Sequence, residues 1–324
     1  MIVTVTPNPS LDRTLEVDEL RRGDVLRAQA CRVEPAGKGI NVARALDGHG
    51  IETLAVLPSG GSEGDQHIRL LTEAGIPHAT VTIAGAIRVN ISVVEPDGTV
   101  TKINEPGPTL VEAELDRLLV AATTGPNDPA WIVGSGSLAP GTSETFYADL
   151  TRRGHLVGAR VAIDSSGGPL GAALVAGPDL VKPNLEELAE VAGLTLATIG
   201  DVVAAAQLVR ERGAVSVLAS LGAAGMLLVD QTGVLHASLP VTSPRSTVGA
   251  GDASLAGYLA VVATDPGERI AALRSGVAFG AAAVSLPGSQ MPGHSDVHPK
   301  LAVLTDEPDP DLPLDTAAPA PAGT

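Results

Sequence analysis

The sequence predicts an α/β protein, a doubly wound and mostly parallel sheet that carries a small antiparallel β lid. Short β-branched runs alternate with helical patterns along the chain, which is typical of such a sheet. Several of these runs are apolar throughout, as strands buried on both faces are. Two charged or alternating segments interrupt the pattern and predict the lid. At 324 residues with 44% hydrophobic content, the chain is long enough to bury a large core.

The elements follow from local patterns, taken in chain order. The predicted parallel strands are Ile2–Thr6, Thr53–Leu57, Ala79–Ile83, Ala130–Gly134, Arg160–Asp164, Asp179–Lys182 and Val215–Ser220. One helix is predicted to begin at Thr109, because Glu112 stands three residues later in a capping-box pattern. A second follows Pro183 over Leu185–Val191, and the last two cover Ala253–Val262 and Glu268–Val284.

The lid is predicted from two segments, at about residues 11–36 and 86–106. The first is rich in charge and has no helical stripe, and the second alternates on both sides of Asp97-Gly98, a strong hairpin signal. Pairing across that turn places one polar set on a single face: Arg88, Asn90, Ser92, Thr101, Ile103 and Glu105. The opposite face then carries Val89, Ile91, Val93 and Val100, together with Lys102.

The predicted apolar face of the lid needs a cover, while the polar face covers a site. A second copy of the same surface, related by a two-fold axis, provides that cover most simply. We therefore expect a homodimer formed through the lid.

Composition excludes some classes of function. The formal net charge of −16 and an aromatic content of 2% argue against nucleic-acid binding, although a small anionic ligand needs only a few local basic groups. The single Cys31 rules out an internal disulfide and fits a reducing compartment. No signal peptide or membrane span is visible, so we expect a cytoplasmic protein with no membrane partner. Residues 305–324 are acidic and rich in Pro and Ala, and we expect a disordered tail after a domain at 1–304.

The most informative motif is Gly249-Ala250-Gly251-Asp252, a small-residue turn that leads into an apolar helix. A helix N-terminus offers unpaired N–H groups and a partial positive charge, and glycine lets an anion approach closely. Asp252 is then either a helix cap or a base that takes a proton beside a bound phosphate.

A second glycine turn, Gly37-Lys38-Gly39, also leads into a helix that contains Asn41. It is not a Walker A loop, because Gly39 follows Lys38 where Ser or Thr is required. The turn is either a tight connection or a site where Lys38, Asn41 and backbone N–H groups hold a polar or anionic ligand.

Two further segments suit a nucleotide and its metal. Asn184 and Glu187, after Lys182 and Pro183, share one face of a helix, where Glu187 either favours the helix dipole or holds the water shell of a magnesium ion. The run Ser220 to Gly225, with Gly222, is either a hairpin loop or a backbone cradle for nucleotide phosphates or ribose.

The run Gly134-Ser135-Gly136-Ser137-Leu138-Ala139 matches a dinucleotide-binding pattern, which suggests a nicotinamide-dependent oxidoreductase. Pro140-Gly141 interrupts the turn before a helix can start, and no acid ends a following strand about 20 residues later. Ser137 is instead a candidate substrate contact at a strand end. Two glycine-lined anion sites, a poised acid, a magnesium-compatible pair and a lid together favour phosphoryl transfer.

These motifs resemble the ribokinase-like, or PfkB, family of carbohydrate kinases over nearly all of residues 1–300. The resemblance rests on Thr6–Asp12, Ala36–Asn41, Thr101–Pro108, Lys182–Asn184 and Val248–Asp252. The first two resemble the branch that contains 1-phosphofructokinases and tagatose-6-phosphate kinases. Two departures remove no functional group: Ala253 stands where serine is common, and Ala139 where proline is common.

The resemblance implies a role for each matching residue. Asp252 is the implied base, and the N–H groups of Gly249, Ala250, Gly251 and Asp252 form the implied anion hole. The implied ATP and magnesium residues are Lys182, Asn184 and Glu187, with Ser220, Gly222 and Gly225 lining the nucleotide site. The implied sugar-phosphate residues are Asp12, Gly37, Lys38, Asn41, Arg88 and Ser137.

The resemblance therefore implies an ATP- and Mg²⁺-dependent sugar-phosphate kinase that converts fructose 1-phosphate to fructose 1,6-bisphosphate. Fructose 6-phosphate and tagatose 6-phosphate remain alternative acceptors, because each pairs a phosphate at one end of a compact ring with a primary hydroxyl at the other. A non-catalytic sugar-phosphate sensor is an alternative of another class, although the retained Asp252 and Gly249–Gly251 turn argue against it.

Overall fold

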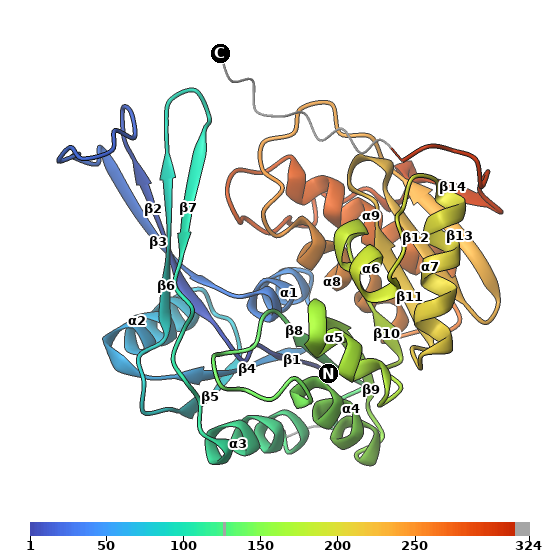
Figure 1. Cartoon of the computed structure of the whole chain (residues 1–324), viewed down its shortest axis with the longest axis horizontal. Coiled ribbons are helices and arrows are strands. Elements are labelled where there is room, and N and C mark those ends of the chain that lie inside the picture. Colours follow the sequence, from blue (N-terminus) through green and yellow to red (C-terminus); the bar gives the residue numbers. More distant parts are fainter. Residues whose placement is uncertain (126–127, 315–324) are drawn as a thin grey trace.

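A ten-stranded sheet forms the middle layer of the computed structural model, which describes residues 1–125 and 128–314 (Figure 1). Its strand order is β14-β13-β12-β11-β10-β9-β8-β1-β4-β5, and it is parallel from β11 to β5 and antiparallel from β11 to β14. The strands are β1 (Ile2–Val5), β4 (Thr53–Ser59), β5 (His78–Thr82), β8 (Trp131–Ser135), β9 (Arg160–Asp164), β10 (Leu180–Val181), β11 (Ser216–Ser220), β12 (Met226–Asp230), β13 (Gly233–Ser238) and β14 (Val303–Asp306).

Helices cover both faces of this sheet, which explains why its parallel strands are apolar on both sides. On one face lie α3 (Glu112–Thr123), α4 (Phe146–Leu156), α5 (Gly167–Leu174), α6 (Leu185–Ala192) and α7 (Ile199–Glu211). On the other lie α1 (Lys38–Asp47), α8 (Ala250–Val262) and α9 (Arg269–Val284). Helix α2 (Gly61–Glu73) packs against β4 and the lid, and two short 3₁₀ helices span Gly222–Ala224 and Pro299–Leu301.

The strand order reverses between β1 and β8. From β1 the chain builds outward through β4 and β5, and from β8 it builds in the other direction through β9, β10 and β11. Ligands of open α/β sheets bind at the carboxyl ends of the strands beside such a switch point. The ends of β8, β9 and β10 bring Ser135, Asp164 and Lys182 to this edge.

The predicted parallel strands are confirmed to within two residues at each end, and Arg160–Asp164 is matched at both ends. The predicted helix start at Thr109 is wrong, because α3 begins at Glu112. Glu114 makes the cap there, accepting the N–H groups of Val111 at 2.9 Å and Ala84 at 2.8 Å. Helix α8 begins at Ala250, three residues before the predicted Ala253, so Asp252 lies inside its first turn.

The lid is a separate sheet, β3-β2-β6-β7, that stands away from the main sheet on the left of Figure 1. Its strands are β2 (Ser10–Glu16), β3 (Ala30–Ala36), β6 (Arg88–Val94) and β7 (Val100–Asn104). The outer ladders are antiparallel as predicted, but the central β2–β6 ladder is parallel. This corrects the expectation of a purely antiparallel lid. Strands β2 and β6 run parallel because both leave the carboxyl edge of the main sheet, after β1 and β5.

The face assignment on β7 is also corrected. Val94 pairs with Val100 and Ser92 with Lys102, because the turn is a five-residue loop closed by Glu95 N–H donating to the Thr99 carbonyl at 3.0 Å. A register shift of one residue moves every side chain of a strand to the other face. Lys102 and Val100 therefore share the face of Arg88, and Ile103 shares the apolar face of Ile91.

The expected tail is ordered further than predicted. Asp306 ends β14, which pairs with β13. Leu314 is only 7% exposed, and its N–H donates to the Ala197 carbonyl at 2.8 Å. The prediction of disorder from 305 is therefore wrong for residues 305–314, because this apolar anchor packs in the main core. Residues 315–324 lie outside the described part of the chain. No helix among the described residues is long and apolar enough to cross a membrane.

Candidate active site

One buried carboxylate bridges two lysines at the switch point. Asp164 ends β9 with a fully buried side chain, and its Oδ1 lies 3.0 Å from Lys38 Nζ and its Oδ2 3.4 Å from Lys182 Nζ. Burial alone raises the pKa of Asp164, but the ammonium groups of Lys182 and Lys38 outweigh it and hold that pKa below its ordinary value. The aspartate is therefore ionised and holds both lysines in place.

Sequence reasoning did not single out Asp164. A signal was present, because the residue is an acid that ends a predicted apolar strand, at the sheet edge where ligands bind. Lys38 and Lys182 were both predicted site residues, and the structure brings them together through this aspartate.

Asp252 lies beside this cluster in the first turn of α8, and its Oδ2 accepts a hydrogen bond from Asn41 Nδ2 at 2.8 Å. Burial, followed by repulsion from Asp164, raises the pKa of Asp252 to about 7, although Asn41, Lys38 and Lys182 oppose the shift. Among the described residues no side chain caps the N-terminus of α8, so the alternative of Asp252 as a simple helix cap is not seen. A carboxyl with a pKa near neutrality is suited to exchange a proton at physiological pH.

The turn before Asp252 has the conformation that an anion site requires. Gly249 has φ 78° and precedes α8, a left-handed conformation in which a side chain is strained. A Cβ added to Gly251 lies 3.3 Å from Lys182 Nζ, so glycine leaves the lysine close to the helix terminus. Among the described residues, the N–H groups of Gly249, Gly251 and Asp252 have no acceptor, while that of Ala250 donates weakly to the Thr247 carbonyl at 3.4 Å.

The predicted sugar-phosphate residues gather where the lid meets the main sheet. Asp12 Oδ1 accepts from Ser10 Oγ at 2.8 Å and from Asn90 Nδ2 at 3.0 Å. Arg88 is half-buried, and its Nη2 donates to the Asn8 carbonyl at 3.0 Å, while its Nε has no partner among the described residues.

Asn8 and Gly37 connect this region to the main sheet. Asn8 Nδ2 donates to the Pro106 carbonyl at 3.1 Å and lies 3.5 Å from Ser137 Oγ, so β1, the lid and the loop after β8 meet at one asparagine. Gly37 immediately precedes α1, with φ 145°, and a Cβ there lies 2.6 Å from Thr6 Cγ2. Only glycine fits this close approach.

The pair Asn184 and Glu187 forms a reciprocal cap at the N-terminus of α6. Asn184 Oδ1 accepts from the N–H of Glu187 at 2.8 Å, and Glu187 Oε2 accepts from the N–H of Asn184 at 2.9 Å. Glu187 Oε1 lies 3.6 Å from Lys38 Nζ and is the atom of the pair that faces the lysine cluster. Both residues therefore cap α6, and Glu187 Oε1 is the carboxylate oxygen of the pair that lies outside the cap.

Magnesium fits this donor set only as a hydrated ion shared with phosphates. Within residues 1–125 and 128–314, no three His, Cys, Asp or Glu side chains cluster to hold a metal. Mg²⁺ keeps several waters and needs only one or two carboxylates when phosphate oxygens complete its shell. Glu187 Oε1, 3.6 Å from Lys38 Nζ, and the buried Asp164 Oδ2, 3.4 Å from Lys182 Nζ, are suitable oxygens.

The predicted nucleotide loop lies at the same sheet edge. Ser220 ends β11 and forms a bridge to Asn184, so the loop lies next to the N-terminus of α6. Gly222 and Gly225 have φ 60° and 95°, and a Cβ at Gly225 lies 2.1 Å from the Ala237 carbonyl oxygen. The segment is a hairpin loop between β11 and β12, as one interpretation proposed, and it lies at the carboxyl end of β11.

The dinucleotide alternative fails on local geometry. After Gly136 the chain turns, with Thr142 N–H donating to the Ala139 carbonyl, and α4 begins only at Phe146. The Gly136 carbonyl accepts from Tyr147 Oη at 2.8 Å and Ser165 Oγ at 3.0 Å. No helix N-terminus therefore follows Gly136 closely enough to bind a pyrophosphate.

The raised pKa of Asp252 predicts a pH dependence. If its carboxylate is the base, kcat/KM of the free enzyme falls about tenfold per pH unit below pH 7, since only the deprotonated form accepts a proton. The check is the pH–rate profile between pH 5 and 9 at constant ionic strength. A flat profile from pH 5.5 to 8 contradicts a base with this pKa.

Comparison with known proteins gives consistent similarities. Residues 8–295 match the pfkB family of carbohydrate kinases. The chain is 38% identical over 264 residues to 1-phosphofructokinase of Rhodobacter capsulatus, covering 80% of this chain and 82% of the relative. It is 36% identical over 307 residues to ATP-dependent 6-phosphofructokinase isozyme 2 of Escherichia coli strain K12, covering 94% and 99%. The crystal structure of phosphofructokinase-2 from Escherichia coli in complex with potassium superposes with a TM-score of 0.85 at 35% identity, covering 91% and 96%.

Proposed function

Because the chain belongs to the pfkB family of carbohydrate kinases and is a phosphofructokinase-type sugar kinase, we propose that its acceptor is fructose 1-phosphate. The products are then fructose 1,6-bisphosphate and ADP. The observation that carries the mechanism is Asp252, a buried carboxyl with a pKa of about 7 at the N-terminus of α8, between Asn41 and the lysine cluster. ATP is the donor, as in the relatives named ATP-dependent.

In the proposed reaction, Asp252 accepts the proton of the acceptor's primary hydroxyl. The hydroxyl oxygen bonds to the γ-phosphorus of ATP, and the bond from that phosphorus to the ADP oxygen breaks. Asn41 orients the carboxylate through its 2.8 Å hydrogen bond. Positioning and charge stabilisation supply most of the rate enhancement in such transfers.

The charge of the transferring group is matched by cations and dipoles from three elements. Lys38 begins α1, Lys182 follows β10, and the N–H groups of Gly249, Ala250, Gly251 and Asp252 open α8. Ser220, Gly222 and Gly225 lie where the nucleotide enters. A bound Mg²⁺ supplies charge neutralisation on the nucleotide phosphates, and Glu187 with Asp164 holds its water shell.

A coupled ADP-release assay over matched acceptors tests the acceptor assignment. We expect the highest kcat/KM with fructose 1-phosphate, against fructose 6-phosphate, tagatose 6-phosphate and unphosphorylated fructose. Higher kcat/KM with fructose 6-phosphate reassigns the chain to the 6-phosphofructokinases, among which it also has a relative at 36% identity. Absence of ADP release with any acceptor supports the sensor alternative.

Arg88 reads the phosphate of the acceptor in this proposal. Arg88→Ala raises KM for the sugar phosphate about tenfold or more, because a charged hydrogen bond contributes about 1.5–3 kcal/mol. KM for ATP stays within about twofold of wild type, as do both KM values in the control Arg69→Ala, on the exposed side of α2. Equal increases in both KM values contradict a local role.

We also propose that the chain forms a homodimer through the apolar face of the lid, defined as Val89, Ile91, Val93 and Ile103. Val93 is already buried and Val89 packs against the main core, whereas Ile103 is 57% exposed and is the part of this face that most needs a cover. A structure of the tetrameric inhibited form of phosphofructokinase-2 from Escherichia coli resembles this chain with a TM-score of 0.83. We also propose a cytoplasmic location, because the single Cys31 cannot form an internal disulfide and fits a reducing compartment.

Light scattering checks the dimer. The wild type should scatter as about twice the 32.5 kDa chain mass, and Ile91→Asp should shift it towards monomer and weaken sugar-phosphate binding. Ser92→Asp, one residue away on the opposite face, should leave the mass unchanged. A monomeric wild type with full activity refutes the lid dimer.

A further inference from the structure

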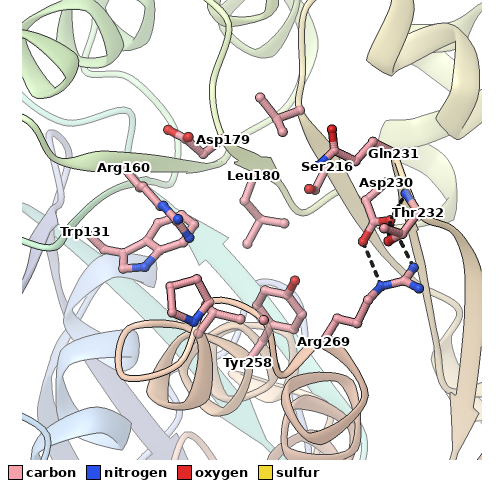
Figure 2. Close-up of a pocket in the computed structure, with 14 residues that line it drawn as sticks. Trp131, Arg160, Asp179, Leu180, Ser216, Asp230, Gln231, Thr232, Tyr258 and Arg269 are labelled. Atoms are coloured by element: carbon pink, nitrogen blue, oxygen red, sulfur yellow. Dashed lines mark hydrogen bonds and ion pairs between the residues drawn. The ribbon is translucent and has the colours of Figure 1, made fainter.

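A second cavity lies at the opposite edge of the main sheet from the active site. It has a volume of about 380 Å³ and opens beside the first residues of four parallel strands, Trp131 of β8, Arg160 of β9, Leu180 of β10 and Ser216 of β11 (Figure 2). Helix α8 closes it with Tyr258 and Val262, and Arg269 of α9 lies at its rim. Its size is within the usual range for small-molecule sites.

The floor of this cavity is apolar and aromatic. Trp131, Leu180, Tyr258 and Val262 are each at most 6% exposed and come from three different elements. In Figure 2 the Arg160 head enters the cavity from the Trp131 side, and the Tyr258 hydroxyl lies on the side of Asp230. Flat aromatic walls with a few convergent polar groups favour an organic ligand over an inorganic ion.

Several polar groups of the cavity reach solvent and are not used in contacts between side chains. Among the described residues, no hydrogen bond or ion pair involves the Trp131 indole N–H, the Tyr258 hydroxyl or the Ser216 hydroxyl. The Arg160 guanidinium likewise has no carboxylate partner there and lies over the Trp131 ring, 5.8 Å from its centroid. Burial, then the nearby Asp230, raises the pKa of Tyr258 to about 12, so its hydroxyl remains a donor.

The other charges around the cavity are already paired. Arg269 Nε and Nη2 each lie 3.0 Å from an oxygen of Asp230, and Asp179 Oδ2 accepts from His155 and from the Val161 N–H at 2.9 and 2.8 Å. Among the described residues that line the cavity, Arg160 is the cation without a carboxylate partner, on a chain whose formal net charge is −16. The unpaired charge and the unpaired donors select an anionic head group.

We propose that this cavity binds a small organic anion, with its anionic head group against Arg160 and the Tyr258 hydroxyl. An apolar or planar body lies on Trp131, Leu180 and Val262. Because β8, β9 and β10 end at the active site and begin at this cavity, the two sites occupy opposite edges of the same strands. The ligand therefore binds without competing with ATP or the sugar phosphate.

Trp131 is the single tryptophan of the chain, so its fluorescence reports on this cavity. The full-length protein is titrated with benzoate, phenyl phosphate and neutral benzyl alcohol, which share an aryl body and differ in the head group. We expect a saturable change in Trp131 emission with an anion and none with benzyl alcohol. Tighter binding of benzoate identifies a carboxylate ligand, and tighter binding of phenyl phosphate identifies a phosphate monoester. No saturable response to either anion overturns the proposal.

Variants locate the binding. Arg160→Leu raises the Kd of the anion about tenfold or more, and Arg160→Gln serves in its place if the leucine variant does not fold. Tyr258→Phe raises the Kd about threefold, while Arg69→Leu on α2 leaves it unchanged. An unchanged Kd in the Arg160 variants, or loss of the signal when ADP and fructose 1-phosphate are saturating, overturns the proposal.

Discussion

Asp252→Asn lowers kcat by about 10²–10⁴-fold while the protein still binds ATP, because the amide cannot take the proton of the acceptor hydroxyl. The variant is nearly isosteric, and Asn41 Nδ2 can still donate to the oxygen of the introduced amide. Steady-state kinetics give kcat, and nucleotide binding is measured separately by calorimetry. An unchanged kcat means that Asp252 is not the base, and the proposed mechanism fails.

Stability provides the control for Asp252→Asn. The folded-state pKa of Asp252 is raised to about 7 from an ordinary 3.8, so the folded protein binds a proton that the unfolded chain releases between those values. The free energy of unfolding therefore loses this contribution as pH rises from about 4 to 7. At pH 8 the Asn variant should be at least as stable as wild type, which separates a catalytic defect from misfolding. Glu211→Gln, an exposed change at the end of α7, should alter neither kcat nor stability.

Asp164→Asn destabilises the fold by about 3–5 kcal/mol at pH 7, the usual cost of leaving a buried charge without its partner. Asp164 has a fully buried side chain, and Lys182 beside it is only 4% exposed. Activity falls as well, because Lys38 and Lys182 lose the group that positions them. Urea denaturation measures the stability loss.

The contribution of Asp164 to the free energy of unfolding should depend on pH. Its pKa is lowered in the folded state, so its contribution is present above the unfolded pKa of 3.8 and is lost as pH falls through the folded value. The difference between wild type and Asp164→Asn should therefore shrink in acid. Asp116→Asn removes an exposed partner of Arg153 and should cost less than about 1 kcal/mol. Equal losses in both variants would show that burial of the Asp164 pairs does not matter.

Local patterns predicted the elements of the sheet and the glycine turns, because each depends on neighbours in the sequence. The apolar runs Ile2–Thr6 and Arg160–Asp164 are strands since burial on both faces requires such composition. The turn Gly249–Gly251 was located because glycine at a helix start leaves a distinct signature. Asp164 was missed because its local signal, an acid at the end of an apolar strand, does not by itself separate a buried site residue from a surface one.

The chain by itself determined the fold class, the glycine turns and the acid at the start of α8, because spacing and residue type along the backbone encode them. Tertiary structure alone decided which residues share a charge environment and which face they occupy. Lys102 changed faces through a one-residue shift in the β6–β7 register, and β2 and β6 run parallel because they leave the same sheet edge. Leu314 is held by contacts with α7 and its flanking residues, more than a hundred positions away. The pKa of Asp252 is the strongest case, since Asn41 and Asp164 reach it from two other elements. Burial and Coulomb interactions depend on distances between side chains, which the order of residues does not specify.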